Sequence, residues 1–94
     1  MKIILNNNSL FKSLRPFNDI GFVPTMGSIH EGHLSLIDRS NRACKKTIVS
    51  IFVNPKQFNN KKDFKNYPTN INEDITILKK TKKVDFLYIP KFKD

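Results

Sequence analysis

The sequence predicts an α/β fold in which helices flank a parallel sheet, and two observations carry this prediction. Short apolar runs typical of strands alternate along the chain with longer runs whose apolar residues have helical spacing. The run "TIVSIFV" at Thr47–Val53 is nearly all apolar or β-branched, as in a strand that is covered on both faces. Because the connections are short, we expect right-handed crossovers between the strands.

The first part of the chain contains a strand, a helix and a second strand. The run "KIIL" (Lys2–Leu5) predicts a short strand. The segment Ser9–Arg15 predicts a short helix, for which Asn8 or Ser9 is the expected N-cap. The apolar run Ile20–Pro24 predicts the second strand.

The next helix is expected from about Glu31 to Lys45, where apolar residues recur at helical spacing. Its apolar positions gather toward one side: Leu34, Ile37 and Cys44, with Leu36 and Ala43 next to them. We expect this side to face the core. Cys44 is interpreted as a small core residue.

A further helix is predicted after Pro68. Asn70 is its expected N-cap, because Glu73 follows three residues later at the spacing of a capping box. Glu73 and Asp74 complement the helix dipole at its start, as do the lysines at its end. The apolar stripe of this helix consists of Ile71, Ile75 and Leu78. The run Val84–Ile89 predicts the last strand.

Composition argues against several classes of partner. The net charge is +9, but the lysines are scattered along the chain and form no basic stripe, so we expect no nucleic-acid partner. No apolar run approaches the roughly 20 residues of a membrane-spanning helix, so we expect no membrane partner. The single Cys44 cannot form an internal disulfide, which indicates a reducing, cytoplasmic setting.

All three glycines and both histidines of the chain fall between Gly21 and His33. This segment runs from a predicted strand through a glycine turn to a helix N-terminus, whose free N–H groups and partial positive charge suit a phosphate. Gly27 and Gly32 allow the phosphate to approach the backbone. His30 and His33, three residues apart, lie on nearly the same side of the first helical turn. The segment therefore predicts a phosphate-binding site, although a tight turn with two polar side chains is the plainer alternative.

Zinc binding is another interpretation of the histidines. His30, His33 and Cys44 fit no common zinc spacing, and a fourth ligand is not evident, so no metal-binding residue is predicted. The two imidazoles are instead expected to hold phosphate oxygens and to stabilise the charge that develops during group transfer.

The tetrad His30-Glu31-Gly32-His33 resembles the HxGH signature of a nucleotidyltransferase superfamily with a Rossmann-like parallel sheet. Further segments narrow the resemblance: "VPTMGSIHEGHLSLI" is followed by "VSIFVNPKQF", "DFKNYP" and "VDFLYIP". In this order and spacing they are similar to the pantothenate synthetase family, from Gly21 to Pro90. Residues 1–94 are accordingly expected to be an incomplete N-terminal nucleotide-binding domain, with the ATP loop at residues 23–37 and the C-terminal part absent.

The resemblance implies an ATP-dependent ligase that makes pantothenate, a precursor of coenzyme A. Pantoate and ATP give pantoyl adenylate and pyrophosphate, and β-alanine then displaces AMP. The resemblance also implies Mg²⁺ beside the ATP and a cytoplasmic, homodimeric full-length enzyme, and we expect this chain alone to be inactive. Two alternatives stay open: another HxGH-type nucleotidyltransferase, and a basic nucleic-acid-binding module without chemistry.

The resemblance also implies which residues form the site. The ATP-binding residues are one continuous segment: Met26, Gly27, Ser28, Ile29, His30, Glu31, Gly32 and His33. Within it, His33 is implied as the catalytic proton donor and His30 as the catalytic histidine that contacts the phosphates. Gln57 is implied to bind pantoate near the β-alanine site, and Thr25 and Asn54 to line the same acid pocket.

Overall fold

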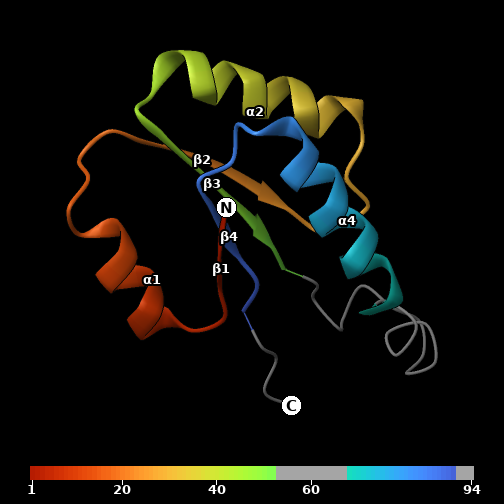
Figure 1. Ribbon diagram of the computed structural model, residues 1–94, viewed down its shortest axis with the longest axis horizontal. Helices are drawn as coiled ribbons and strands as arrows, with labels where there is room; N and C mark the ends of the chain where they lie inside the picture. The colour runs from red at the N-terminus through yellow and green to blue at the C-terminus, as the bar shows by residue number, and fades with distance from the viewer. Residues whose placement is uncertain (53–67, 91–94) are drawn as a thin grey trace.

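The structure is a computed structural model that describes residues 1–52 and 68–90 (Figure 1). Its strands are β1 (Lys2–Ile4), β2 (Ile20–Thr25), β3 (Lys46–Ile51) and β4 (Phe86–Tyr88). Its helices are α1 (Asn7–Leu14), α2 (Glu31–Ala43) and α4 (Pro68–Thr81). The strands lie in the order β1-β4-β3-β2, and every neighbouring pair is parallel. The predicted α/β fold with a parallel sheet is confirmed.

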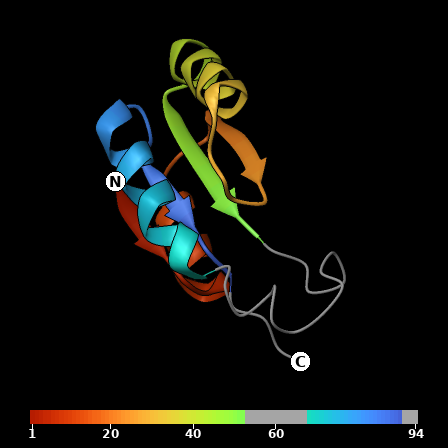
Figure 2. The same cartoon turned by 90° about the vertical axis from the view of Figure 1, so that its right-hand side faces the viewer.

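Helices cover both faces of the sheet (Figure 1, Figure 2). On one face, α1 packs through Leu10 and Leu14. The buried residues beneath it are Ile4, Ile48 and Phe86. On the other face, α2 and α4 pack over a larger cluster: Val23, Ile29, Ile37, Val49, Ile51, Leu78, Val84 and Leu87. Because Ile29 belongs to this cluster, the core extends into the loop that precedes α2.

Both predicted helix caps were wrong. The N-cap of α1 is Asn6, whose side-chain oxygen accepts the Ser9 N–H at 2.8 Å, so this helix begins earlier than the sequence suggested. Helix α4 begins at Pro68, which places Asn70 inside its first turn rather than at the cap. Proline suits the first helical position, because the N–H that it lacks would have no partner within the helix there.

The predicted core faces of the two longer helices are confirmed in their central residues. Ile37 and Leu78 are fully buried, and Leu34 and Ile75 pack against the same cluster. Leu36 lies at the margin of the buried face, since its side chain remains 49% exposed. Cys44 is the half-buried C-cap residue of α2.

The parallel arrangement brings the carboxyl ends of the strands to one edge of the sheet. Strands β2 and β3 are paired over their whole lengths, from Ile20 opposite Lys46 to Thr25 opposite Ile51. The pairing continues one step further, because the Phe52 N–H donates to the Thr25 carbonyl at 3.0 Å. The loop from β2 to α2 leaves the sheet at this edge (Figure 1). Among the described residues, no helix is long and apolar enough to cross a membrane.

Candidate functional site

The loop between β2 and α2 comprises residues 26–30 and contains the glycine turn seen in the sequence. Its backbone enters the left-handed region at two successive residues, Gly27 with φ 90° and Ser28 with φ 54°. Glycine adopts this conformation freely, whereas serine has a Cβ atom that disfavours it. The shape of the loop therefore depends on contacts that hold Ser28 in place.

Thr25 provides the first of these contacts, at the end of β2. Its hydroxyl group donates to the Ser50 carbonyl at 2.9 Å and accepts the Gly27 N–H at 3.1 Å. The side chain is only 7% exposed. Thr25 thus ties the start of the loop to β3. Because its O–H proton is already donated, the hydroxyl group can offer a ligand only an acceptor.

Asp74, on α4, provides the second contact. One carboxylate oxygen accepts the Ser28 N–H at 3.0 Å, and the other accepts the Ile29 N–H at 2.9 Å. The residue is only 3% exposed. Hydrogen bonds to an ionised carboxylate are stronger than those between neutral groups. Asp74 therefore fixes the two residues that follow Gly27.

The sequence reasoning missed this role and assigned Asp74 to the helix dipole. Since α4 begins at Pro68, Asp74 lies beyond its first turn. A signal was present, because Asp74 lies three residues after Ile71 and four before Leu78, on the predicted apolar stripe. A carboxylate on such a stripe requires partners when it is buried.

The two histidines cap α2 reciprocally. The Nδ1 atom of His30 accepts the Gly32 N–H at 3.0 Å, and the Nδ1 atom of His33 accepts the His30 N–H at 3.2 Å. Their rings lie close together, with centroids 4.1 Å apart. An imidazole nitrogen that accepts a hydrogen bond carries no proton, so each neutral ring carries its proton on Nε2. The pair therefore offers two Nε2–H donors next to a helix N-terminus.

The electrostatics of the loop favour a neutral His33. Burial lowers the pKa of His33 below its usual 6.5, and the His30 imidazole lowers it further, whereas the Asp74 carboxylate opposes both effects. This direction agrees with the hydrogen bond that Nδ1 of His33 accepts. Near neutral pH, the group that His33 presents to a ligand is thus an N–H donor on a neutral ring.

Gly32 allows the His30 ring to lie against the start of α2. A Cβ atom at Gly32 would lie 2.8 Å from Cε1 and 3.1 Å from Nδ1 of His30. The glycine of the HxGH tetrad therefore makes room for the ring of the first histidine. Gly21 is glycine for a packing reason, because a Cβ atom there would lie 1.9 Å from Oγ of Ser40 on α2.

A cavity of about 340 Å³ opens at the carboxyl ends of β2 and β3. The residues that line it are Pro24, Thr25, Met26, His33, Ser50 and Phe52. Its size suits a small polar molecule or part of a nucleotide. The structure thus brings two of the predicted site residues, Thr25 and His33, to one cavity. Asn54 and Gln57, the other residues of the predicted acid pocket, lie outside the described residues.

The described residues do not form a Mg²⁺ site of their own. Both oxygens of Asp74 already accept backbone N–H groups. In residues 1–52 and 68–90, no group of three or more His, Cys, Asp and Glu side chains is arranged to hold a metal ion. Mg²⁺ that accompanies ATP is commonly bound largely by phosphate oxygens and water.

Comparison with known proteins gives a consistent result. The family model described as Pantoate-beta-alanine ligase matches residues 2–94. A pantothenate synthetase from Pseudothermotoga lettingae is 48% identical over 90 residues, which cover 96% of this chain and 32% of that protein. The crystal structure of pantothenate synthetase from Thermus thermophilus superposes with a TM-score of 0.80 at 37% identity, covering 97% of this chain and 32% of that one.

A third relative was solved with ligands. Pantoate-beta-alanine ligase from Francisella tularensis, complexed with beta-gamma ATP and beta-alanine, superposes with a TM-score of 0.72 at 46% identity. The alignment covers 96% of this chain and 36% of that one. The chain thus spans about a third of the length of the relatives that it matches.

Proposed function

The chain belongs to the pantoate-beta-alanine ligase family, and from this premise we propose that it forms the N-terminal, ATP-binding part of an enzyme that joins pantoate to β-alanine. In the first step, a carboxylate oxygen of pantoate attacks the α-phosphorus of ATP and pyrophosphate leaves. In the second step, the β-alanine amine attacks the acyl carbon of pantoyl adenylate and AMP leaves. The observation that carries the proposal is the His30–His33 pair, capped onto α2 beside the cavity that His33 lines.

The loop supplies hydrogen-bond donors where negative charge develops. His33 lines the cavity, and its Nε2–H is free of the capping contact, because that contact uses Nδ1. A fixed donor aimed at the phosphates stabilises the transition state without reorganisation during the reaction. His30 acts on the same phosphates from the helix N-terminus, and the segment from Met26 to His33 surrounds them.

The acid substrates bind next to the nucleotide, at the carboxyl ends of β2 and β3. Thr25 and Ser50 form the floor of the cavity there. The Thr25 hydroxyl contributes mainly by shaping the turn, since its proton is donated to Ser50. Gln57 and Asn54 line the same pocket in this proposal. Mg²⁺ accompanies the ATP, and the full-length protein is a homodimer.

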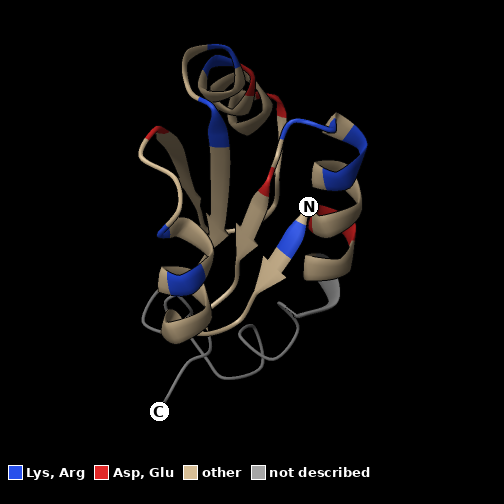
Figure 3. Cartoon of the chain, turned by 60° about the vertical axis from the view of Figure 1, so that its left-hand side comes forward, with Lys and Arg blue, Asp and Glu red and all other residues tan. Residues whose placement is uncertain are grey.

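The two alternative functions find less support. The family match spans residues 2–94 rather than the HxGH tetrad alone, which favours the ligase over another nucleotidyltransferase. Basic residues occur on several elements of the described part, with acidic residues among them (Figure 3). Lys83 and Arg42 are paired with Asp38, and Lys46 with Asp85. This arrangement does not form the continuous basic stripe that a nucleic-acid-binding module needs.

The proposal is tested by joining residues 1–94 to the remaining part of the Francisella tularensis relative. The joined protein should release pyrophosphate from ATP only when pantoate is present, and AMP only when β-alanine is added as well. Circular dichroism and a cooperative thermal transition establish that the joined protein is folded. A folded protein that binds ATP but releases no pyrophosphate with pantoate would contradict the proposal.

A further inference from the structure

Asp74 has an environment unlike that of the other acidic residues described. Asp74 is buried on α4, and the loop that it contacts, residues 26–30, lies between β2 and α2. Each of its carboxylate oxygens accepts a backbone N–H of that loop. We propose that Asp74 is a positioning residue: by binding the Ser28 and Ile29 amides, it holds the loop in the shape that presents His30 and His33 to the phosphates. This inference rests on the proposed function, because it concerns the same phosphate site.

The first support is the conformation of the loop itself. Ser28 has φ 54°, which costs an L-residue about 1 kcal/mol or more relative to the right-handed region. The residues on either side of Ser28 are fixed, Gly27 through the Thr25 hydroxyl and Ile29 through the apolar core. The Ser28 and Ile29 N–H groups point to the same carboxylate. The strained residue is thus held directly by Asp74.

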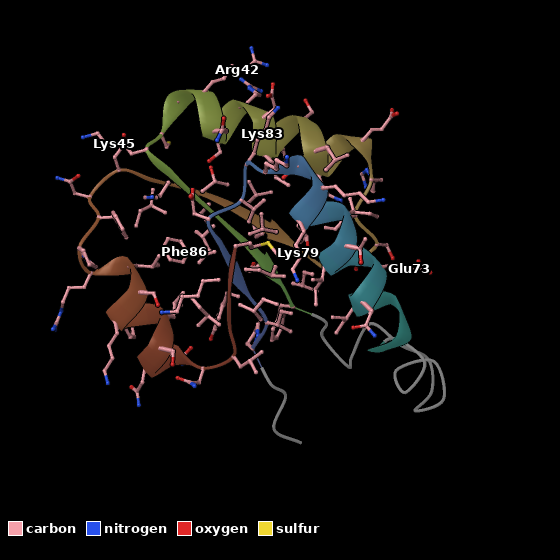
Figure 4. All side chains as sticks on the ribbon, in the orientation of Figure 1. Arg42, Lys45, Glu73, Lys79, Lys83 and Phe86 are labelled. Carbon is pink, nitrogen blue, oxygen red and sulfur yellow. The ribbon has the colours of Figure 1, made fainter. Side chains whose placement is uncertain are left out.

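The second support is that α4 and α2 pack on the same core cluster and that an ion pair joins α2 to the residues after α4. Leu78 and Ile75 of α4 pack on the cluster that contains Ile37 of α2. Beyond the end of α4, Lys83 donates to Asp38 of α2 at 2.6 Å, and Figure 4 shows Lys83 next to Arg42, the second partner of Asp38. The carboxylate of Asp74 is therefore presented from a helix that packs on the same core as α2. A contact made from a helix is positioned more precisely than one made from a loop.

The third support is the effect of Asp74 on the two histidines. Ser28 and Ile29 directly precede His30, whose backbone N–H and side chain both take part in the reciprocal cap of α2. A shift at Ser28 should therefore move His30 and weaken that cap. The Asp74 carboxylate also acts on His33 through space, in the direction of a higher pKa. Loss of Asp74 should thus change both the geometry of the histidine pair and the proton affinity of His33.

Hydrogen exchange in the unmodified chain is the first test. The Ser28 and Ile29 amides belong to no helix or strand, yet their hydrogen bonds to a buried carboxylate should slow their exchange at least about tenfold relative to unprotected amides. A scalar coupling across the hydrogen bond from the Ile29 amide to the carboxylate carbon of Asp74 should also be detectable by NMR. Rapid exchange of both amides with no such coupling would overturn the proposal without any substitution.

The second test compares Asp74→Asn with Glu73→Gln. Both variants remove one negative charge from the same turn of α4, but Glu73 is exposed and is a suitable control. In Asp74→Asn, one of the two acceptors becomes a donor that faces a backbone N–H. The amide signals of residues 27–33 should shift, and the pKa of His33 should fall relative to that in Glu73→Gln.

ATP affinity distinguishes positioning from a purely structural role. The measurement uses the joined protein described above. If Asp74→Asn leaves the loop in its native conformation only about a tenth of the time, the dissociation constant of ATP rises about tenfold. The measurement is made well below the thermal transition of each variant, so that only folded protein is compared. Unchanged ATP affinity together with unchanged loop signals in folded Asp74→Asn would overturn the proposal. Absence of ATP binding by the joined protein without the substitution would instead contradict the proposed function, because the exchange and pKa measurements need no nucleotide.

Discussion

The half-buried side chain of His33 combines two features. Its Nδ1 is occupied by the His30 N–H, and its ring lines the cavity at the end of β2. The backbone contact fixes the tautomer, and the tautomer determines which nitrogen can donate to a ligand. A histidine that only caps a helix would not need to face a cavity, so the combination supports a role in binding phosphate.

Replacement of His33 by alanine should slow the first chemical step. In the protein joined to the remainder of the Francisella tularensis relative, His33→Ala should reduce the rate of pantoyl adenylate formation by about 10²–10³-fold, the usual effect of losing one transition-state donor. Pantoate affinity should change little. Single-turnover kinetics measure the step directly, and Ser35→Ala, an exposed position on the same helix, is the matched control. A normal rate in His33→Ala would exclude this role.

Acid should destabilise the fold in part through His33. Its pKa is lower in the folded chain than the usual 6.5, so the unfolded state binds the proton more tightly. The stabilisation from the neutral ring is present above about pH 6.5 and is lost as the pH falls through the lower folded pKa. Urea denaturation at about pH 7.5 and about pH 5 should show a smaller acid-induced loss of unfolding free energy in His33→Gln than in the unmodified chain. An equal loss in both proteins would show that His33 does not contribute.

At the scale of elements, the three described helices differ in how their N-termini are capped. Helix α1 is capped by a side chain, α4 begins at a proline, and α2 is capped by two imidazoles. Histidine is not among the favoured N-cap residues, which are Ser, Thr, Asp and Asn. The unusual cap of α2 beside a cavity supports the proposed role of the two histidines in binding.

The cap of α1 can be tested with two neighbouring asparagines. Asn6→Ala removes the acceptor for the Ser9 N–H and should lower the unfolding free energy by about 1 kcal/mol. Asn8→Ala is the matched control, because Asn8 is exposed and lies within the helix, where alanine is favourable. Chemical denaturation of both variants measures the difference. A larger loss in Asn8→Ala would restore the cap that the sequence alone predicted.

Local patterns predicted the elements better than the contacts between them. The alternation of apolar runs predicted the parallel sheet, and helical spacing predicted that Ile37 and Leu78 are buried. The caps were misplaced because several asparagines compete within a few residues, and each is an acceptable cap. The contact of Asp74 with Ser28 joins residues 46 positions apart, so no local pattern contains it. The predicted assignments of Gln57 and Asn54 stay predictions.

At the scale of the whole molecule, the β2 edge of the sheet carries exposed apolar side chains. In the described part, β2 is an edge strand, and Phe22 on it is 60% exposed. Met26 and Phe52 are also exposed, at the end of the same strand and of β3. An edge strand that carries large apolar side chains tends to pair with another surface.

The 94-residue chain should therefore associate through the β2 edge. Phe22→Gln should shift sedimentation-velocity profiles toward the monomer. Phe11→Gln is the matched control, since Phe11 is 72% exposed but lies on α1 and not on an edge strand. Equal effects of the two substitutions would show that association depends on apolar surface in general and not on this edge.

The separation of Ser28 and Asp74 in the sequence also affects when the loop can adopt its final shape during synthesis of the chain. Strand β2, the loop and α2 leave the ribosome before α4, and the carboxylate that binds the loop follows 46 residues after Ser28. At cellular rates of synthesis of about 5–20 residues per second, the nascent loop waits several seconds for its anchor. The loop should thus reach its final shape only after α4 has docked.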